Sequence, residues 1–301
     1  MHKKELVSVI IPTYRRASKI EQALESVFLQ TYQNIEVIVV DDNANFPDER
    51  EKTFSIVKKF KNVRLIQNEK NLGGALARNV GINAASGKYI AFLDDDDVYK
   101  PDKIEKQYEL FCRTQDSGVG LVVSNIYGSK LPKNNKELLY KQMMKHIALT
   151  STWFTTKEIL EDVGYFENSP SEQDAILLLK IIAKGYNIYA VYEKLVVFVD
   201  HEDEESISGH KVKNIIGLEN FRSWCRKYYR ILNNKNMENN VEYQLSLRLL
   251  NLDLINNLRS KAFIEFKNLF KRKPFNKSTY KSAVKIILPS TSIWMERKNK
   301  K

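Results

Sequence analysis

The sequence has 301 residues, 43% of them hydrophobic and 28% charged, which is typical of a globular chain with a sizeable core. No stretch approaches the roughly 18 consecutive apolar residues of a membrane span, and no cleavage-like site follows Leu6–Ile11, so we expect neither a span nor a signal peptide. The net charge of +11 lies wholly in residues 259–301, with 13 Lys/Arg and 2 Asp/Glu, which disfavours a nucleic-acid-binding core.

Short apolar runs alternate with segments of helical periodicity through the first 125 residues. The predicted strands are Leu6–Ile11, Ile35–Val40, Val63–Ile66, Tyr89–Leu93 and Gly120–Asn125. The predicted helices are Lys19–Gln30, Lys52–Phe60, Gly73–Ala85 and Asp102–Thr114. This alternation predicts βαβ units and a mainly parallel sheet, whose ligands bind beyond the carboxyl ends of the strands.

The second half of the chain is less regular and then becomes helical. We expect strands at Trp153–Thr155 and Ala190–Asp200, around a helix at Gln173–Lys184. The polar, Lys-rich stretch Lys130–Lys145 is interpreted as a loop and helix that face an acceptor. After Ser208 the pattern predicts helices alone.

Four adjacent aspartates, Asp94–Asp97, follow the predicted strand Tyr89–Leu93. Neighbouring carboxylates repel one another unless a cation or water offsets their charge. Hard divalent ions such as Mg²⁺ and Mn²⁺ take oxygen ligands, commonly one or two carboxylates with substrate phosphates completing the shell. The segment therefore predicts metal binding, and a solvated acidic turn that caps the following helix is the structural alternative.

Two weaker signals lie at the same predicted edge of the sheet. Asp41 and Asp42 end a strand, where an aspartate is often only a turn or capping residue; the functional alternative is a carboxylate that binds a base or ribose. Gly73–Gly74 with Arg78 indicates close backbone approach and a cation aimed at a phosphate or base. A tight loop beside an ordinary surface arginine explains the same residues.

Two single residues in the second half are candidates for chemistry. Asp174 opens the predicted helix Gln173–Lys184, where an aspartate is usually a cap and a catalytic carboxylate is the alternative. His201 follows a predicted strand and precedes acidic residues. It is either a metal or phosphate contact or a lone surface histidine.

Taken in order, the segments resemble the family-2 glycosyltransferases of the GT-A fold over about two-thirds of the chain. The matching segments are Val7–Tyr14, Ser26–Tyr32, Val39–Asp42, Asn71–Gly74, Ala77–Asn79, Ala85–Asp97, Asp162–Phe166, Glu172–Asp174, His201 and Ser206–Ser208. The resemblance implies an α/β, Rossmann-like, mixed and mainly parallel sheet flanked by helices. It also implies a catalytic domain at 1–208, with its nucleotide-binding half at about 1–100 and its acceptor-binding half at about 101–208. A helical region follows at 209–301.

The resemblance also implies a role for individual residues. Asp94 and Asp96 match the family's DxD pair, and Asp96, Asp94 and His201 would hold Mn²⁺ or Mg²⁺. Asp174 matches the general base, although Gln173 stands where relatives commonly have a second acidic residue. The residues implied to bind the nucleotide-sugar are Pro12, Thr13, Tyr14, Asp42, Arg78, Asp94 and Asp95.

The implied reaction is a metal-dependent, inverting transfer of a hexosyl or N-acetylhexosaminyl group from a nucleotide-sugar to an acceptor hydroxyl. UDP is the default carrier, and dTDP and GDP remain open. A polyprenyl-linked glycan of bacterial cell-surface polysaccharide is the expected acceptor. The alternatives are a sugar nucleotidyltransferase and a catalytically degenerate relative that binds carbohydrate or membrane.

The basic tail, residues 259–301, mixes Lys and Arg with apolar and aromatic residues. Such segments lie in the interface of anionic membranes, so we expect a cytoplasmic protein at the inner face of the cell membrane. Cys112 and Cys225, which form no CxxC pair, fit that reducing compartment. The alternative is a solvated basic helix packed on the catalytic domain. The helical C-terminal region also offers a surface for a homodimer.

Overall fold

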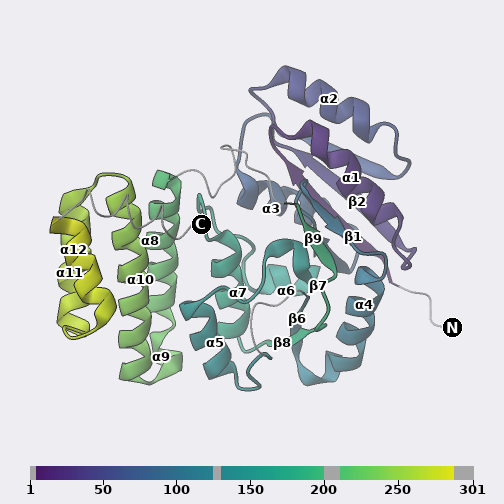
Figure 1. The fold of residues 1–301 in the computed structure, drawn as a ribbon. Coiled ribbons are helices and arrows are strands. Elements are labelled where there is room, and N and C mark those ends of the chain that lie inside the picture. The colour runs from purple at the N-terminus through teal and green to yellow at the C-terminus, as the bar shows by residue number, and fades with distance from the viewer. Residues whose placement is uncertain (1–4, 125–129, 200–210, 288–301) are drawn as a thin grey trace. The chain divides into compact units, whose positions relative to one another are not determined.

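The computed structural model describes residues 5–124, 130–199 and 211–287 (Figure 1). A seven-stranded sheet, in the order β3-β2-β1-β4-β7-β6-β8, is the centre of the unit formed by residues 5–168 and 173–199. Its strands are β1 (Val7–Thr13), β2 (Ile35–Asp41), β3 (Val63–Gln67), β4 (Tyr89–Phe92), β6 (Val119–Val123), β7 (Trp153–Thr156) and β8 (Asn187–Ala190).

The pairing within this sheet is mixed and mainly parallel. β1 lies parallel to β2 and β4, β2 to β3, and β6 to β8. Only β7 is antiparallel to its neighbours β4 and β6. The carboxyl ends of β1, β2 and β4 therefore meet at one edge of the sheet, as the sequence predicts.

Helices occupy the connections between these strands. Their bounds are α1 (Ala17–Phe28), α2 (Pro47–Val57), α3 (Gly74–Ala84), α4 (Lys103–Thr114), α5 (Asn135–Met144), α6 (Lys157–Asp162) and α7 (Gln173–Ala183). The prediction of one strand at Ala190–Asp200 is wrong. β8 joins the large sheet, whereas β9 (Val196–Phe198) pairs antiparallel with β5 (Asp97–Tyr99) in a sheet of two strands. Residues 191–195 carry the chain from one sheet to the other.

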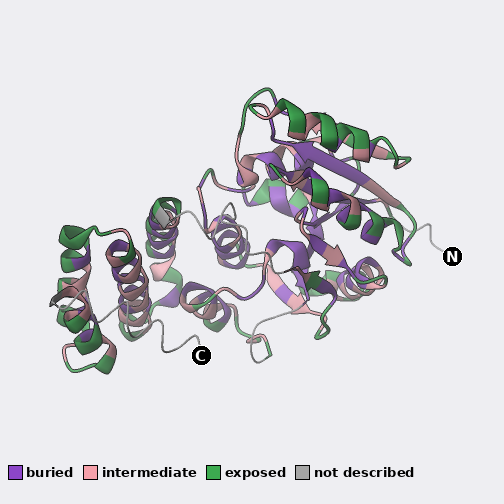
Figure 2. Ribbon diagram, turned by 45° about the horizontal axis from the view of Figure 1, so that its top comes forward, coloured by how far each residue is buried: buried purple, intermediate pink, exposed green. Residues whose placement is uncertain are grey.

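The buried residues of this unit gather on the strands of the large sheet (Figure 2). β1 is buried on both faces, because a parallel strand between two others and under helices needs apolar side chains on each side. On α3, a Cβ at Gly81 would stand 2.4 Å from Ile10 Cγ2, so the absence of a side chain lets this helix pack against β1. This packing fixes the start of α3 near the carboxyl edge of the sheet.

Residues 169–172 and 211–287 form a second compact unit. Its helices are α8 (Lys211–Lys227), α9 (Tyr229–Leu232), α10 (Lys235–Ile255), α11 (Arg259–Arg272) and α12 (Lys277–Ile287). Among the described residues, no helix is both long and apolar enough to cross a membrane. The short segment 169–172 is held tightly: Glu172, at a left-handed φ of 60°, pairs with Arg248 at 2.6 Å, and a Cβ on Gly217 would lie 2.8 Å from the Ser171 carbonyl oxygen.

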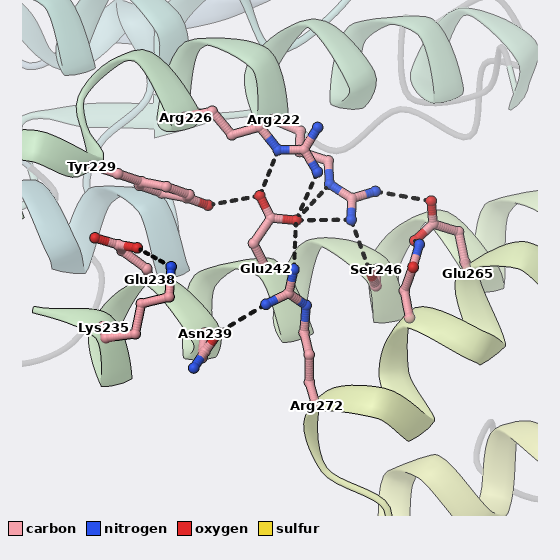
Figure 3. A network of polar contacts seen from close by, with 11 residues as sticks. Arg222, Arg226, Tyr229, Lys235, Glu238, Asn239, Glu242, Ser246, Glu265 and Arg272 are labelled. Carbon is pink, nitrogen blue, oxygen red and sulfur yellow. Dashed lines mark hydrogen bonds and ion pairs between the residues drawn. The ribbon is translucent and has the colours of Figure 1, made fainter.

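A polar network around the buried Glu242 joins four of these helices (Figure 3). Its carboxylate accepts from Arg222 Nε at 2.9 Å, Arg226 Nε at 2.6 Å and the Tyr229 hydroxyl at 3.0 Å. Arg272 Nη2 approaches to 3.9 Å. Burial raises the pKa of Glu242, but the Arg226 and Arg222 guanidiniums outweigh it and lower the pKa to about 2. The carboxylate is therefore a charged centre of this unit.

Candidate active site

The four aspartates predicted at the end of β4 form a fixed acidic turn, Asp94–Asp97. The Asp97 amide donates to the Asp94 carbonyl at 3.0 Å, which closes the turn. Ser151 holds both ends: its hydroxyl donates to Asp97 Oδ2 at 2.5 Å and accepts from the Asp94 amide at 3.0 Å. Asp95 and Asp97 are buried, whereas the side chains of Asp94 and Asp96 are 37% and 20% exposed. The exposed pair is the one that a ligand can reach.

Two arginines offset part of the charge of this turn. Arg78 Nη2 donates to Asp94 Oδ1 at 2.5 Å. Arg16 Nη1 forms an ion pair with Asp96 Oδ2 and lies 3.5 Å from Asp95 Oδ1. Each of the more exposed carboxylates of the turn, Asp94 and Asp96, is thus paired with an arginine.

The two buried carboxyls of the turn, Asp95 and Asp97, both have a raised pKa. Burial raises the pKa of Asp95 to about 7, with Asp96 and Asp94 adding to the shift and the Thr13 hydroxyl and Arg16 opposing it. Burial also raises the pKa of Asp97 to about 8, helped by Asp94 and opposed by the Ser151 hydroxyl. Near neutral pH, Asp95 is therefore about half protonated and Asp97 mostly protonated, because a charge on either would be desolvated and repelled.

The turn suits a hard divalent cation only if other oxygens complete its coordination. No group of three or more His, Cys, Asp or Glu side chains arranged to hold a metal occurs in the part of the chain that the structure describes. Asp94 and Asp96 supply carboxylate oxygens, and Mg²⁺-type sites often use one or two carboxylates with substrate phosphates and water. The third predicted ligand, His201, lies outside the described residues.

Asp42, at the carboxyl end of β2, organises a neighbouring loop. Its amide donates to the Thr13 carbonyl at 3.0 Å, which ties it to the end of β1. Its carboxylate accepts from the Leu72 amide at 2.9 Å, the Gly73 amide at 2.8 Å and Asn68 Nδ2 at 2.9 Å. Gly73 has a φ of 80°, which favours glycine. The binding of a base by Asp42, expected from the sequence, remains a prediction.

An exposed aromatic side chain follows β1 at the same edge. The Tyr14 ring is 42% exposed and stands 5.7 Å from the Phe46 ring, nearly perpendicular to it. Arg15 covers the Phe46 ring with its guanidinium carbon 4.6 Å from the centroid, and its amide donates to Asn43 Oδ1 at 2.6 Å. Pro12 is half-buried in the strand just before. Tyr14 therefore presents a ring on which a planar base can pack.

Arg78 connects the acidic turn to the helix that carries Asp174. Beside its bond to Asp94, Arg78 Nη1 donates to Gln173 Oε1 at 3.3 Å. Gln173 opens α7, and the half-exposed Asp174 follows it. Gly74 leaves room for this arginine, since a Cβ there would lie 3.2 Å from Nη1. The structure thus brings together Arg78, Asp94 and the start of α7.

Three residues that organise this site were not singled out from the sequence. Arg16 and Ser151 contact the acidic turn, and Asn68 holds Asp42. A signal existed only for Arg16, because it follows a strand at the edge where the carboxylates were expected to gather.

Solved structures with similar folds cover nearly the whole chain. Mannosyltransferase PcManGT from Pyrobaculum calidifontis, solved with GDP-Man and Mn²⁺, has a TM-score of 0.62 at 18% identity and covers 96% of this chain and 88% of its own. TarS 1-349 from S. aureus, solved with UDP-GlcNAc, has a TM-score of 0.60 at 20% identity, and the match covers 88% of this chain and 79% of the TarS chain. These likenesses and the mixed sheet define a GT-A fold.

The family follows from the sequence of the same unit. The model of glycosyl transferase family 2 matches residues 8–164, more than half of the 301 residues. The chain therefore belongs to glycosyl transferase family 2, which confirms the resemblance.

Curated relatives agree with this assignment. The putative teichuronic acid biosynthesis glycosyltransferase TuaG of Bacillus subtilis is 32% identical over 223 residues, which are 70% of this chain and 84% of TuaG. The UDP-Glc:alpha-D-GlcNAc-diphosphoundecaprenol beta-1,3-glucosyltransferase WfaP of Escherichia coli is 32% identical over 225 residues, 72% and 85% of the two chains. An uncharacterized glycosyltransferase of Rickettsia felis is 34% identical over 190 residues. The match covers 60% of this chain but only 30% of that longer protein.

Proposed function

We propose that this protein is a metal-dependent, inverting glycosyltransferase that moves a sugar from a nucleotide-sugar to an acceptor hydroxyl. The observation that carries the proposal is the link made by Arg78, which bonds the exposed Asp94 of the acidic turn and Gln173 beside Asp174. This link joins residues suited to a metal diphosphate and a carboxylate suited to general-base catalysis.

Each part of the site has a chemical task in this proposal. Asp96 and Asp94 hold Mn²⁺ or Mg²⁺, which when bound offsets charge on the leaving nucleotide. His201 remains the proposed third ligand. Tyr14 packs on the nucleotide base. Asp42, which holds the Leu72–Gly73 loop, hydrogen-bonds the same base. Asp174 takes the proton of the attacking hydroxyl.

The donor is proposed to be a UDP-sugar. WfaP, whose name gives a UDP-Glc donor, and TarS, solved with UDP-GlcNAc, support UDP, whereas PcManGT was solved with GDP-Man. The transferred group is proposed to be a hexosyl or N-acetylhexosaminyl group.

A thermal-shift panel of UDP, GDP, dTDP and CDP, each with and without Mn²⁺, tests the donor site. We expect UDP with Mn²⁺ to raise the Tm by about 4–6 °C at a concentration near 100 times its Kd, where binding adds about 2.7 kcal/mol. Asp96→Ala should remove the part of the shift that depends on Mn²⁺. Equal shifts with and without the metal would contradict metal dependence, and no shift with any nucleotide would contradict the donor site.

The acceptor is proposed to be a lipid-linked glycan at an anionic membrane. The name of WfaP, which gives a GlcNAc-diphosphoundecaprenol acceptor, supports the lipid-linked glycan. Helices α11 and α12 expose apolar side chains among their lysines, and Phe275, in the connection between them, is 88% exposed. Burying an aromatic ring in the interface and placing lysines near anionic headgroups both stabilise the bound state.

Liposome flotation tests this surface. Replacing Phe270 and Phe275 together by serine should weaken binding to vesicles with about 30% anionic lipid by roughly tenfold or more, because two exposed rings no longer enter the interface. Phe54→Ser is the matched control, since Phe54 is an exposed aromatic residue of α2, far from the basic tail in the sequence. Equal binding of the double variant and the control would contradict a membrane role for α11 and α12.

A further inference from the structure

Arg16 occupies the carboxylate at which the proposed metal would bind. It lies between β1 and α1, and its Nη1 forms the ion pair with Asp96 Oδ2 and stands 3.5 Å from Asp95 Oδ1. Its side chain is only 21% exposed. Burial lowers the pKa of Arg16, but the neighbouring Asp95 and Asp96 raise it by more, so its pKa lies above the ordinary value. The guanidinium is thus charged and held by the acidic turn.

A guanidinium and a divalent cation exclude each other from one carboxylate oxygen. Both are positive, so at van der Waals separation they repel, and the repulsion is stronger in a partly buried site than in water. Arginine cannot lose its proton to relieve this repulsion. A metal that binds Asp96 Oδ2 must therefore displace Arg16 from that oxygen.

The donor supplies the place to which Arg16 can move. A diphosphate adds negative charge beside the metal, and its oxygens match the planar donors of a guanidinium. Arg78 differs, because Gln173 fixes it from a second side and the Phe166 ring lies 5.7 Å from its guanidinium carbon. Among the described residues, the ion pairs of the Arg16 side chain are with Asp95 and Asp96, both in the acidic turn.

We propose that Arg16 is a built-in competitor for the divalent cation, which holds Asp96 while the site lacks nucleotide and releases it when a nucleoside diphosphate accepts its guanidinium. Metal and donor then bind together, because each favours the same displacement of Arg16. The inference rests on the proposed metal role of Asp96. It assigns Arg16 to the control of that metal's affinity.

Mn²⁺ binding to the full chain, followed by the electron paramagnetic resonance of free Mn²⁺, tests the inference without any turnover. Arg16→Gln should bind Mn²⁺ without nucleotide about tenfold more tightly than wild type, since a charged hydrogen bond no longer has to be broken. UDP should tighten Mn²⁺ binding by wild type and do so much less in the variant. Arg64→Gln is the matched control, because Arg64 Nη1 donates to the carbonyl of Ala84, the last residue of α3, at 2.9 Å and should leave both affinities unchanged.

The outcomes separate this inference from the function beneath it. Equal Mn²⁺ affinities of wild type and Arg16→Gln overturn the competitor role and leave the metal site standing. No Mn²⁺ binding by any variant, with or without UDP, overturns the metal site and with it the inference. If Arg16→Gln does not fold, Arg16→Lys takes its place: it keeps the charge but loses the planar donors, and its Mn²⁺ affinity should again exceed that of wild type.

Discussion

Replacing Asp174 by asparagine should lower sugar transfer by about 10³-fold or more and leave donor binding nearly intact. An amide cannot take the proton of the attacking hydroxyl, and general-base catalysis contributes roughly 10²- to 10⁴-fold. The fold should tolerate the change, because Asp174 Oδ1 accepts from the next amide at 2.8 Å and an asparagine oxygen can do the same. Release of nucleoside diphosphate and the Kd of UDP with Mn²⁺ are the two measurements.

Asp162→Asn is the matched control for this experiment. Asp162 is also a helical aspartate, but it pairs with Lys184 on the surface at 2.9 Å, so its variant should turn over like wild type. Wild-type turnover in Asp174→Asn would remove Asp174 from the mechanism. A loss of UDP binding equal to the loss of transfer would make it a donor-binding residue instead.

Replacing Glu242 by glutamine should lower the free energy of unfolding of the helical unit by about 3 kcal/mol at pH 7. The pKa of this carboxyl is lowered from 4.5 to about 2, and each pKa unit corresponds to about 1.4 kcal/mol. Breaking a buried ion pair by removing one partner costs a similar amount, about 3–5 kcal/mol, because the arginines stay behind without their anion. Hydrogen exchange of the α8 and α10 amides measures the effect within this unit.

The difference in free energy of unfolding between wild type and Glu242→Gln should depend on pH in a defined direction. A carboxyl with a lowered pKa stabilises the folded state fully above its unfolded pKa and loses that stabilisation as pH falls toward its folded value. The gap between wild type and Glu242→Gln should therefore be constant above about pH 4.5 and shrink between about pH 4.5 and 2. Glu238→Gln is the control: Glu238 pairs with the exposed Lys235 at 3.0 Å, so its replacement should cost less than about 0.5 kcal/mol. A gap that does not change with pH would contradict this role of Glu242.

Strand positions could be predicted from sequence because they depend on local patterns. β1, β2 and β4 are mostly apolar runs, and the placement of polar residues at their carboxyl ends follows from the parallel arrangement. β5 and β9 could not be separated in the same way. Each has three residues, and they exist through their pairing with one another across the sequence.

The roles of single side chains were harder to predict, since they depend on contacts between distant residues. Ser151 lies more than 50 residues from the turn that it holds, and no spacing announces it. Composition alone favours a cap at Asp174, and the contact that suggests more is made by its neighbour Gln173 with Arg78. Asp41 and Asp42 are alike in sequence, yet only Asp42 binds the glycine loop, while Asp41 is buried against Asn43.

The four residues 169–172 limit where this chain can be divided to build chimeric enzymes. They belong to the helical unit, whereas the residues on both sides of them belong to the catalytic sheet, so the chain passes from one unit to the other three times. Glu172, the residue before α7, has a left-handed backbone and pairs with Arg248. A graft that exchanges only the C-terminal helices would remove this partner of Glu172. A workable exchange must carry both pieces, or keep the partners of 169–172 on the incoming helices.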